Sequence, residues 1–132
     1  MGHANETRLR AFLDAYAAND AEAIRDALAA DATWHVGGTH ALSGDYGGQP
    51  EILEYFGRVS AETAGTLRLE PIELMANDHR GAAFLRVTGD RGSQHLDVTM
   101  AEAFQFDDDG RIREFWAHAT DQDAIDRFWS EG

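Results

Sequence analysis

The sequence predicts an α+β fold in which helices pack on one face of a curved antiparallel sheet. Apolar residues recur at helical spacing through the first half of the chain. After Gly65 the apolar period changes to that of a strand, and turn residues divide the second half into four stretches of strand length. Helices followed by a meander are typical of α+β domains. The chain has 132 residues, so we expect one domain over residues 1–132.

The first helix is predicted by apolar residues on one helical face, namely Leu9, Phe12, Leu13, Tyr16 and Ala17. A second, short helix is expected to begin at Asn19, an N-cap residue with Glu22 as its capping-box partner, and to bury Ile24 and Leu28. A short β-prone stretch, residues 31–36, follows.

Residues 37–48 are expected to form a loop, because they contain five glycines. Pro50 suits the first turn of a third helix, and Gly65 suits its end. The apolar stripe of this helix is Ile52, Tyr55, Phe56 and Val59.

The strand half begins with an edge strand around Pro71, where a shift in the alternation indicates a bulge. Three further strands are expected over residues 82–88, 95–106 and 111–119, separated by turns. Asp121 is a candidate N-cap for a last short helix that ends near Phe128 and Trp129.

The strand over residues 95–106 carries one unusual residue. Its even positions are apolar except for Glu102, so this carboxyl is expected to point into the interior. The predicted turns place Glu102 opposite Phe115 and Leu85 opposite Val98. On the outer face they place Arg86 beside Asp97 and Thr99 beside His118.

Burial disfavours the charged form of a carboxyl group and raises its pKa. A neutral Glu102 suits a general acid or a hydrogen-bond donor to a carbonyl. Two structural alternatives remain open at this point. Glu102 forms a hydrogen bond with a buried partner such as Tyr16 or Tyr46, or a register slip places it at the rim of the sheet.

The composition excludes several classes of function. The formal net charge is −13 and all 11 basic residues are Arg, so the surface repels nucleic-acid phosphates and anionic membranes. The absence of cysteine excludes thiol nucleophiles, disulfides and Cys-based zinc sites. The polar N-terminal segment is not a signal peptide, and we expect a soluble, cytoplasmic protein. No His or carboxylate spacing indicates a metal site, and no cofactor motif is present.

Three segments are similar to the nuclear transport factor 2-like superfamily, in its SnoaL-like and ketosteroid isomerase-like branch. They are residues 31–36, residues 42–48 leading into 52–56, and residues 104–112 followed by 114–116. The resemblance extends over roughly residues 5–129 and implies a cystatin-like roll, a cone of curved sheet closed by three helices around a deep pocket. Enzymes and non-catalytic binders share this fold.

The steroid isomerases of this branch use an Asp base and an oxyanion hole made of a Tyr and a protonated Asp. The resemblance places Val36 at the position of the base, Phe12 at the oxyanion Tyr and Phe56 at a supporting Tyr. Only Glu102 keeps a carboxyl, at the protonated-Asp position. Steroid isomerase activity is therefore not expected. The nearest functional analogy is the SnoaL-like polyketide cyclases, which close rings by aldol chemistry without a cofactor.

We therefore expect a cavity that binds a hydrophobic small molecule. Glu102 is the candidate acid, and His40 or Tyr46 assists it, His40 as a base that titrates near neutrality. The chemistry would be that of a cyclase, isomerase or dehydratase, and the alternative is a ligand-binding module without catalysis. The other residues expected to line the cavity are Phe12, Tyr16, Trp34, Val36, Phe56, Met100 and Phe115.

The outer face of the sheet is the candidate interface. His35, His95 and His118 are expected to point outward, and Trp116 beside them suits an aromatic interface anchor. The resemblance implies a homodimer through this face, and a domain that acts only through it is a third alternative. The expected interface residues are Arg86, Asp97, Trp116 and His118.

Overall fold

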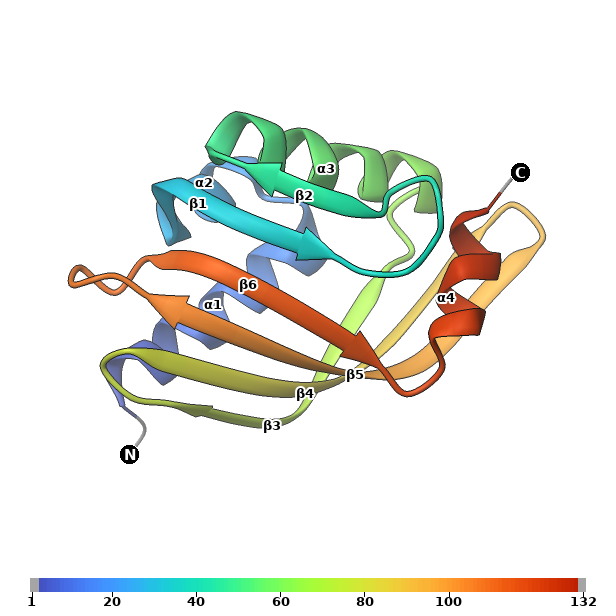
Figure 1. Ribbon diagram of the computed structural model, residues 1–132. Coiled ribbons are helices and arrows are strands. Elements are labelled where there is room, and N and C mark those ends of the chain that lie inside the picture. The colour runs from blue at the N-terminus through green and yellow to red at the C-terminus, as the bar shows by residue number, and fades with distance from the viewer. Residues whose placement is uncertain (1–2, 131–132) are drawn as a thin grey trace.

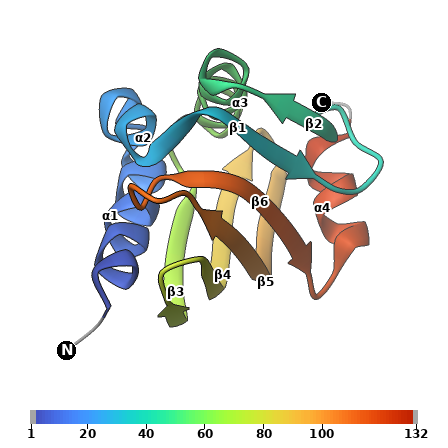
Figure 2. The ribbon, with the colours of Figure 1, turned by 60° about the vertical axis from the view of Figure 1, so that its left-hand side comes forward.

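The computed structural model describes residues 3–130 and confirms the α+β fold (Figures 1 and 2). Six strands form one curved sheet in the order β2-β1-β6-β5-β4-β3. Figure 1 shows α4 at the end of the sheet where the β4–β5 hairpin turns. The helices are α1 (Ala4–Ala18), α2 (Ala21–Ala27), α3 (Gln49–Thr63) and α4 (Gln122–Trp129). The strands are β1 (Leu28–Val36), β2 (Gly44–Gly47), β3 (Arg68–Ala76), β4 (Arg80–Arg91), β5 (Gln94–Phe106) and β6 (Ile112–Ala119).

The sheet is mixed, which the sequence did not predict. Leu28 begins β1 and does not belong to the second helix, and β1 pairs in parallel with β6. The expected loop over residues 37–48 contains β2, which pairs antiparallel with β1 and places Tyr46 opposite Trp34. A four-residue strand with a glycine at each end has no alternation to detect, so only the pairing with β1 reveals it.

The helix ends follow the expected chemistry with one correction. Asn19 is the C-cap of α1, in the left-handed conformation with φ 52°, and Asp20 is the N-cap of α2, where it accepts a hydrogen bond from the Ala23 N–H. Asn tolerates the left-handed conformation, so Asn19 ends α1. The N-cap of α2 is therefore the next residue, Asp20. Pro50 in the first turn of α3 and Asp121 as the N-cap of α4 are confirmed.

The register of the long strands differs from the predicted one by two residues. Glu102 lies opposite Ala83 and Ala117, and Leu85 lies opposite Met100. The β4–β5 hairpin continues to a two-residue turn at residues 92–93, beyond the expected strand ends. A shift of two residues preserves the faces, because side chains alternate with a period of two.

The outer-face pairs shift with this register. Arg86 lies opposite Thr99, although its guanidinium still reaches Asp97 diagonally, and His118 lies opposite Ala101 instead of Thr99. The bulge predicted at Pro71 in the edge strand β3 is present.

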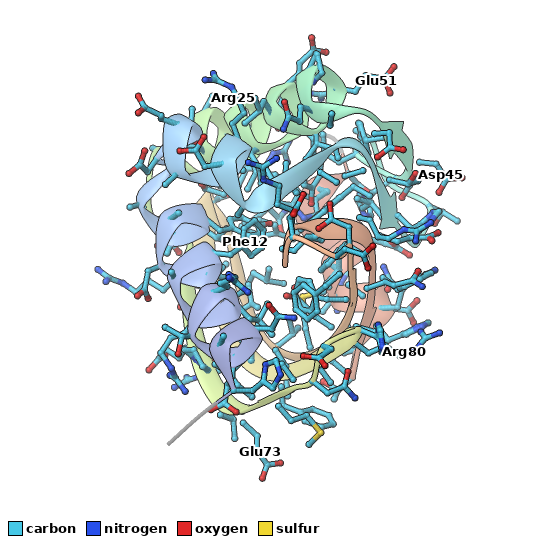
Figure 3. All side chains as sticks on the ribbon, turned by 90° about the vertical axis from the view of Figure 1, so that its left-hand side faces the viewer. Phe12, Arg25, Asp45, Glu51, Glu73 and Arg80 are labelled. Atoms are coloured by element: carbon cyan, nitrogen blue, oxygen red, sulfur yellow. The ribbon has the colours of Figure 1, made fainter. Side chains whose placement is uncertain are left out.

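The core lies between the helices and the inner face of the sheet. Phe12 is 1% exposed and packs its ring against Trp34, Phe56 and Phe104. Trp34 of β1 stacks on Phe115 of β6, with ring centroids 3.6 Å apart. In Figure 3, Phe12 points inward from α1, whereas labelled charged side chains such as Arg80 lie on the outside. The aromatic cluster thereby joins α1 and α3 to β1, β5 and β6.

Gly81 on β4 provides a test of this packing. A Cβ added there lies 3.0 Å from two ring atoms of Phe106 and 3.2 Å from Leu9 Cδ2, and both side chains are buried. We expect Gly81→Ala to lower the free energy of unfolding by about 1–3 kcal/mol, measured by urea denaturation. Gly57→Ala is the matched control: a Cβ on this exposed glycine of α3 meets no atom within 4 Å, so this change is expected to stabilise. Equal effects of the two substitutions would contradict the packing described.

Candidate functional site

A cavity of about 70 Å³ lies on the inner face of the sheet, between α1, α3 and α4. Trp34 and Phe115, whose rings stack on each other, are both part of its lining. The other lining residues are Tyr16, His35, Val36, Gly37, His40, Tyr55, Val59, Leu67, Leu69, Val87, Leu96, Met100, Glu102, Ala117, Gln122, Ile125 and Trp129. The lining is therefore mostly apolar with a few polar groups, as in ligand sites generally.

Glu102 lies on this lining in the middle of β5, as the alternation of the strand predicts. Its side chain is buried, with a residue exposure of 6%, and within residues 3–130 its Oε1 atom has no hydrogen-bond partner. Removal from water raises the pKa of Glu102 to about 8. At neutral pH the group is therefore mainly a neutral carboxylic acid, which both donates and accepts a hydrogen bond.

Two phenols lie near this carboxyl. Tyr16 of α1 and Tyr55 of α3 share a hydrogen bond, and both are electrostatically coupled to Glu102. Burial raises the pKa of each phenol, so both stay neutral. Tyr16 was a candidate partner of the buried carboxyl, but Glu102 Oε1 has no hydrogen-bond partner within residues 3–130.

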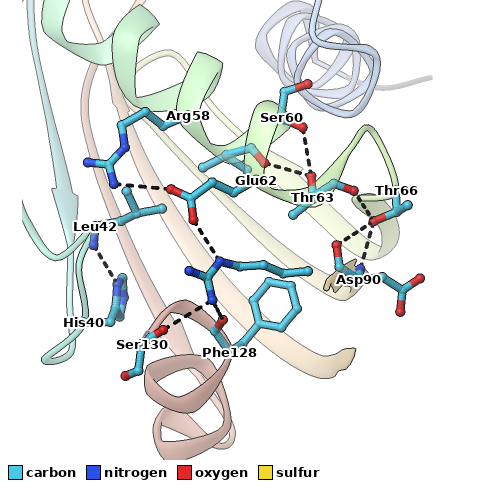
Figure 4. Close-up of polar contacts among 12 residues, drawn as sticks. His40, Leu42, Arg58, Ser60, Glu62, Thr63, Thr66, Asp90, Phe128 and Ser130 are labelled. Carbon is cyan, nitrogen blue, oxygen red and sulfur yellow. Dashed lines mark hydrogen bonds and ion pairs between the residues drawn. The ribbon is translucent and has the colours of Figure 1, made fainter. Parts of the chain in front are cut away.

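His40 enters the same cavity from the β1–β2 loop. Its Nδ1 atom accepts a hydrogen bond of 3.1 Å from the Leu42 N–H (Figure 4), and the loop is further held by the hydrogen bond from the His40 N–H to Ser43 Oγ. Within the described residues, its buried Nε2 atom has no partner. Burial lowers the pKa of His40, despite the opposing effects of the Asp126 carboxylate and the Gly37 backbone carbonyl, so the neutral form of the ring is favoured at pH 7.

Three residues expected in the cavity do not line it. Phe12 and Phe56 lie in the aromatic core, 1% and 3% exposed. Tyr46 packs its ring on Tyr55 and donates its hydroxyl to the Leu42 carbonyl at 2.7 Å. From α1 and α3, the aromatic residues that reach the cavity are Tyr16 and Tyr55 instead. Helical spacing alone does not distinguish the core side of an apolar stripe from its cavity side.

Helix α4 supplies lining residues that sequence reasoning missed, namely Gln122, Ile125 and Trp129. Its amphipathic spacing, with Ile125, Phe128 and Trp129 buried, was the available signal. Two contacts hold α4 in place. Arg91 bonds Glu62 of α3 and the carbonyls of Phe128 and Ser130, three partners that Figure 4 labels, and Asp126 accepts hydrogen bonds from Thr39.

His35 borders the cavity, but its imidazole points to the opposite side of β1, as expected. Its two ring nitrogens bond Asp45 at 2.7 Å and Glu114 at 2.8 Å, and its ring stacks on Trp116. Ionised carboxylates only accept hydrogen bonds, so both nitrogens carry protons and the ring is an imidazolium. The hydrogen bond to Asp45 and then that to Glu114 raise the pKa of His35. This histidine ties β2 and β6 to β1.

The described part of the chain holds no group of three or more His, Cys, Asp or Glu side chains arranged to bind a metal ion. Within residues 3–130, no helix has the length and apolar character required to cross a membrane.

The comparisons with known proteins agree with this geometry. The model of the SnoaL-like domain family matches residues 9–115. The chain belongs to the SnoaL-like family. This places it in the nuclear transport factor 2-like superfamily, as the sequence motifs suggested. No curated protein matches the chain.

Solved structures extend the likeness of this SnoaL-like protein over nearly its whole length. Bal32a, from a soil-derived mobile gene cassette, is 30% identical, with 95% of each chain covered and a TM-score of 0.90. A Xanthomonas campestris protein with a cystatin-like fold is 22% identical, with 99% and 100% covered and a TM-score of 0.89. IdmH of Streptomyces antibioticus, a candidate polyketide cyclase, is 17% identical, with 89% and 93% covered and a TM-score of 0.73. The last two show the fold alone.

The buried carboxyl predicts a pH dependence of stability. The pKa of Glu102 is raised to about 8 in the folded state, from 4.5. The folded state therefore holds a proton that the unfolded state has lost, and this contribution to stability is present below pH 4.5 and is lost as the pH rises through 8. We expect carbon-13 NMR to give a carboxyl midpoint near 8, and the free energy of unfolding to fall by a few kcal/mol between pH 5 and 9.

The variant Glu102→Gln should remove this pH dependence of the free energy of unfolding. The control Glu73→Gln, at an exposed site on β3, should retain it. A Glu102 midpoint near 4.5 would contradict the buried, neutral state of this carboxyl.

Proposed function

We propose that this SnoaL-like protein binds a small, mostly apolar carbonyl compound and that neutral Glu102 donates a hydrogen bond to its carbonyl oxygen. The observation that carries the proposal is the Glu102 carboxyl, which is buried in an apolar cavity with Oε1 unpaired within residues 3–130. A buried polar atom without a partner costs about 1–3 kcal/mol, and a ligand that bonds it recovers that free energy.

The same contact supports acid/base chemistry beside the carbonyl. A hydrogen bond to the carbonyl oxygen stabilises the negative charge that develops there when a neighbouring C–H bond loses its proton. This is the proton-transfer step that a cofactor-free cyclase, isomerase or dehydratase acting beside a carbonyl would require. The family membership and the fold shared with a candidate polyketide cyclase support this class of reaction.

Binding without turnover is the second candidate, and one observation favours it. Among the described residues that line the cavity, each titratable group is engaged or protonated: His35 lies between two carboxylates, the lone pair of His40 Nδ1 accepts from Leu42, and Glu102 is neutral. The variant Glu102→Gln separates the two functions. An enzyme that uses Glu102 retains ligand affinity and loses turnover in this variant, whereas a binding module has no turnover to lose.

The proposal predicts how ligand binding depends on pH. Valerophenone, a phenyl ketone with one carbonyl group, serves as the probe. Its Kd should be constant below about pH 7 and rise about tenfold per pH unit above 8, because the ionised carboxylate no longer donates a hydrogen bond. Isothermal titration calorimetry measures this profile. Glu102→Gln should give a flat profile and Glu73→Gln the wild-type one. A wild-type Kd that does not change between pH 7 and 10 would rule out Glu102 as the donor.

We also propose that two copies of the chain associate through the outer sheet face. The strand registers place Met75, Ala82, Ala103 and Trp116 side by side across four strands. Phe84 lies two residues further along β4 than Ala82, opposite Ala101. Met75 is 55% exposed and Phe84 46% exposed. Exposed apolar groups that adjoin small residues form a flat surface, and such patches mark interfaces.

Arg86 and Asp97 flank this surface with a bidentate ion pair of 2.7 and 3.0 Å. Phe84→Asp should convert a dimer into a monomer in light scattering, because it places a charge in the centre of the apolar patch. Ile72→Asp makes a similar change in the bulge of β3 at the sheet edge and should leave the dimer intact. A wild-type monomer at 100 μM, or a dimer that both variants retain, would refute this assembly.

A further inference from the structure

We infer that His40 is a second hydrogen-bond donor of the cavity, acting through its Nε2–H group, and that the ligand is an uncharged, mostly apolar compound with two acceptor oxygens, such as a diketone. This inference rests on the proposed function, because it concerns the same cavity. It names a second contact and the class of molecule that satisfies both.

The protonation of the His40 ring follows from one backbone contact. The Leu42 N–H donates to Nδ1 at 3.1 Å, and an imidazole nitrogen that accepts a hydrogen bond carries a lone pair and no proton. A neutral imidazole with a bare Nδ1 carries its proton on Nε2. The buried Nε2 atom, which has no partner in residues 3–130, is therefore a donor and not a base.

The loop holds this ring before any ligand arrives. The hydroxyl of Ser43 accepts from the His40 N–H at 2.9 Å and donates to the Gly37 carbonyl at 3.0 Å. Leu42, 1% exposed, anchors the loop in the core. Asp126 of α4 holds the adjacent Thr39 N–H at 3.0 Å. The ring is held at Nδ1, and the loop that carries it is held at its backbone and by α4. Nε2 therefore has little remaining freedom, which lowers the entropy lost on binding.

The two unpaired groups define the ligand. Glu102 and His40 lie on the lining of one cavity, on β5 and on the β1–β2 loop, and both are donors at neutral pH. The residues around them are largely apolar, so the body of the ligand is apolar too. None of the described lining residues is an Arg, and the imidazolium of His35 is engaged by two carboxylates. An anionic ligand therefore has no free cation to pair with, which favours a neutral compound with two acceptors.

The protonation state of His40 is measured directly on the wild-type protein. A long-range ¹H–¹⁵N correlation spectrum at pH 7 distinguishes the two neutral tautomers and the imidazolium, and the His40 signals are those missing from the His40→Phe spectrum. We expect the Nε2–H tautomer. An Nδ1–H tautomer or an imidazolium at pH 7 would overturn the inference, whatever the variants do.

The ligand class is tested with two probes of equal chain length. 1-Phenylpentane-1,4-dione has two acceptor oxygens, and valerophenone has one. Wild-type protein should bind the diketone about three- to tenfold more tightly, which corresponds to one neutral hydrogen bond. His40→Phe keeps a flat ring and removes the donor, so it should abolish this preference. His79→Phe changes an exposed histidine in the β3–β4 turn and should retain the preference.

Failure of this inference is distinguishable from failure of the proposed function. If the Glu102 carbon-13 signal responds to valerophenone but wild type and His40→Phe show the same diketone preference, only the role of His40 is wrong. If the Glu102 signal responds to neither probe, the proposed function fails. A diketone that binds wild type no more tightly than valerophenone would exclude the two-acceptor class.

Discussion

The candidate site depends on one carboxyl group that is held away from water and has no hydrogen-bond partner at Oε1 among residues 3–130. Glu102 lies among apolar side chains, and its neighbours across the sheet are the two alanines Ala83 and Ala117. Small side chains on both adjacent strands leave space above the sheet, and Ala117 lines the cavity itself. The phenols of Tyr16 and Tyr55 lie near the carboxyl, yet among residues 3–130 Oε1 has no hydrogen-bond partner. An unpaired buried polar atom costs free energy, which a hydrogen-bonding partner would recover.

The elements around the cavity are joined to one another by contacts that lie outside it. Arg91 links α3, through Glu62, to the last carbonyls of α4, and Asp126 of α4 holds the β1–β2 loop at Thr39. These contacts are polar and lie beside the apolar lining. They hold α4 beside the cavity, so the cavity is lined by elements far apart in sequence. Preorganisation of this kind keeps the polar groups in place before a ligand binds.

Two histidines five positions apart show how strongly local partners control charge. His35 has a carboxylate at each ring nitrogen and is an imidazolium, which ties the edge of the sheet together. His40 has a backbone N–H at one nitrogen, and burial lowers its pKa, so it is neutral. The same residue type thus serves as a structural cation on the outer face and as a neutral donor in the cavity. Neither role follows from the residue type alone, because the hydrogen-bond partners lie on other segments of the chain.

The sequence by itself determined the fold class, the order of the described helices and strands apart from β2, and the inward orientation of Glu102. These properties depend on local periodicity, and the two-residue error in register left the faces unchanged because side chains alternate with a period of two. Only the tertiary structure decided that β1 and β6 run in parallel, that Tyr55 and α4 line the cavity, and that Tyr46 does not. It also decided which nitrogen of His40 is free. Those features are set by contacts between segments distant in sequence, and a periodic pattern contains no information about such partners.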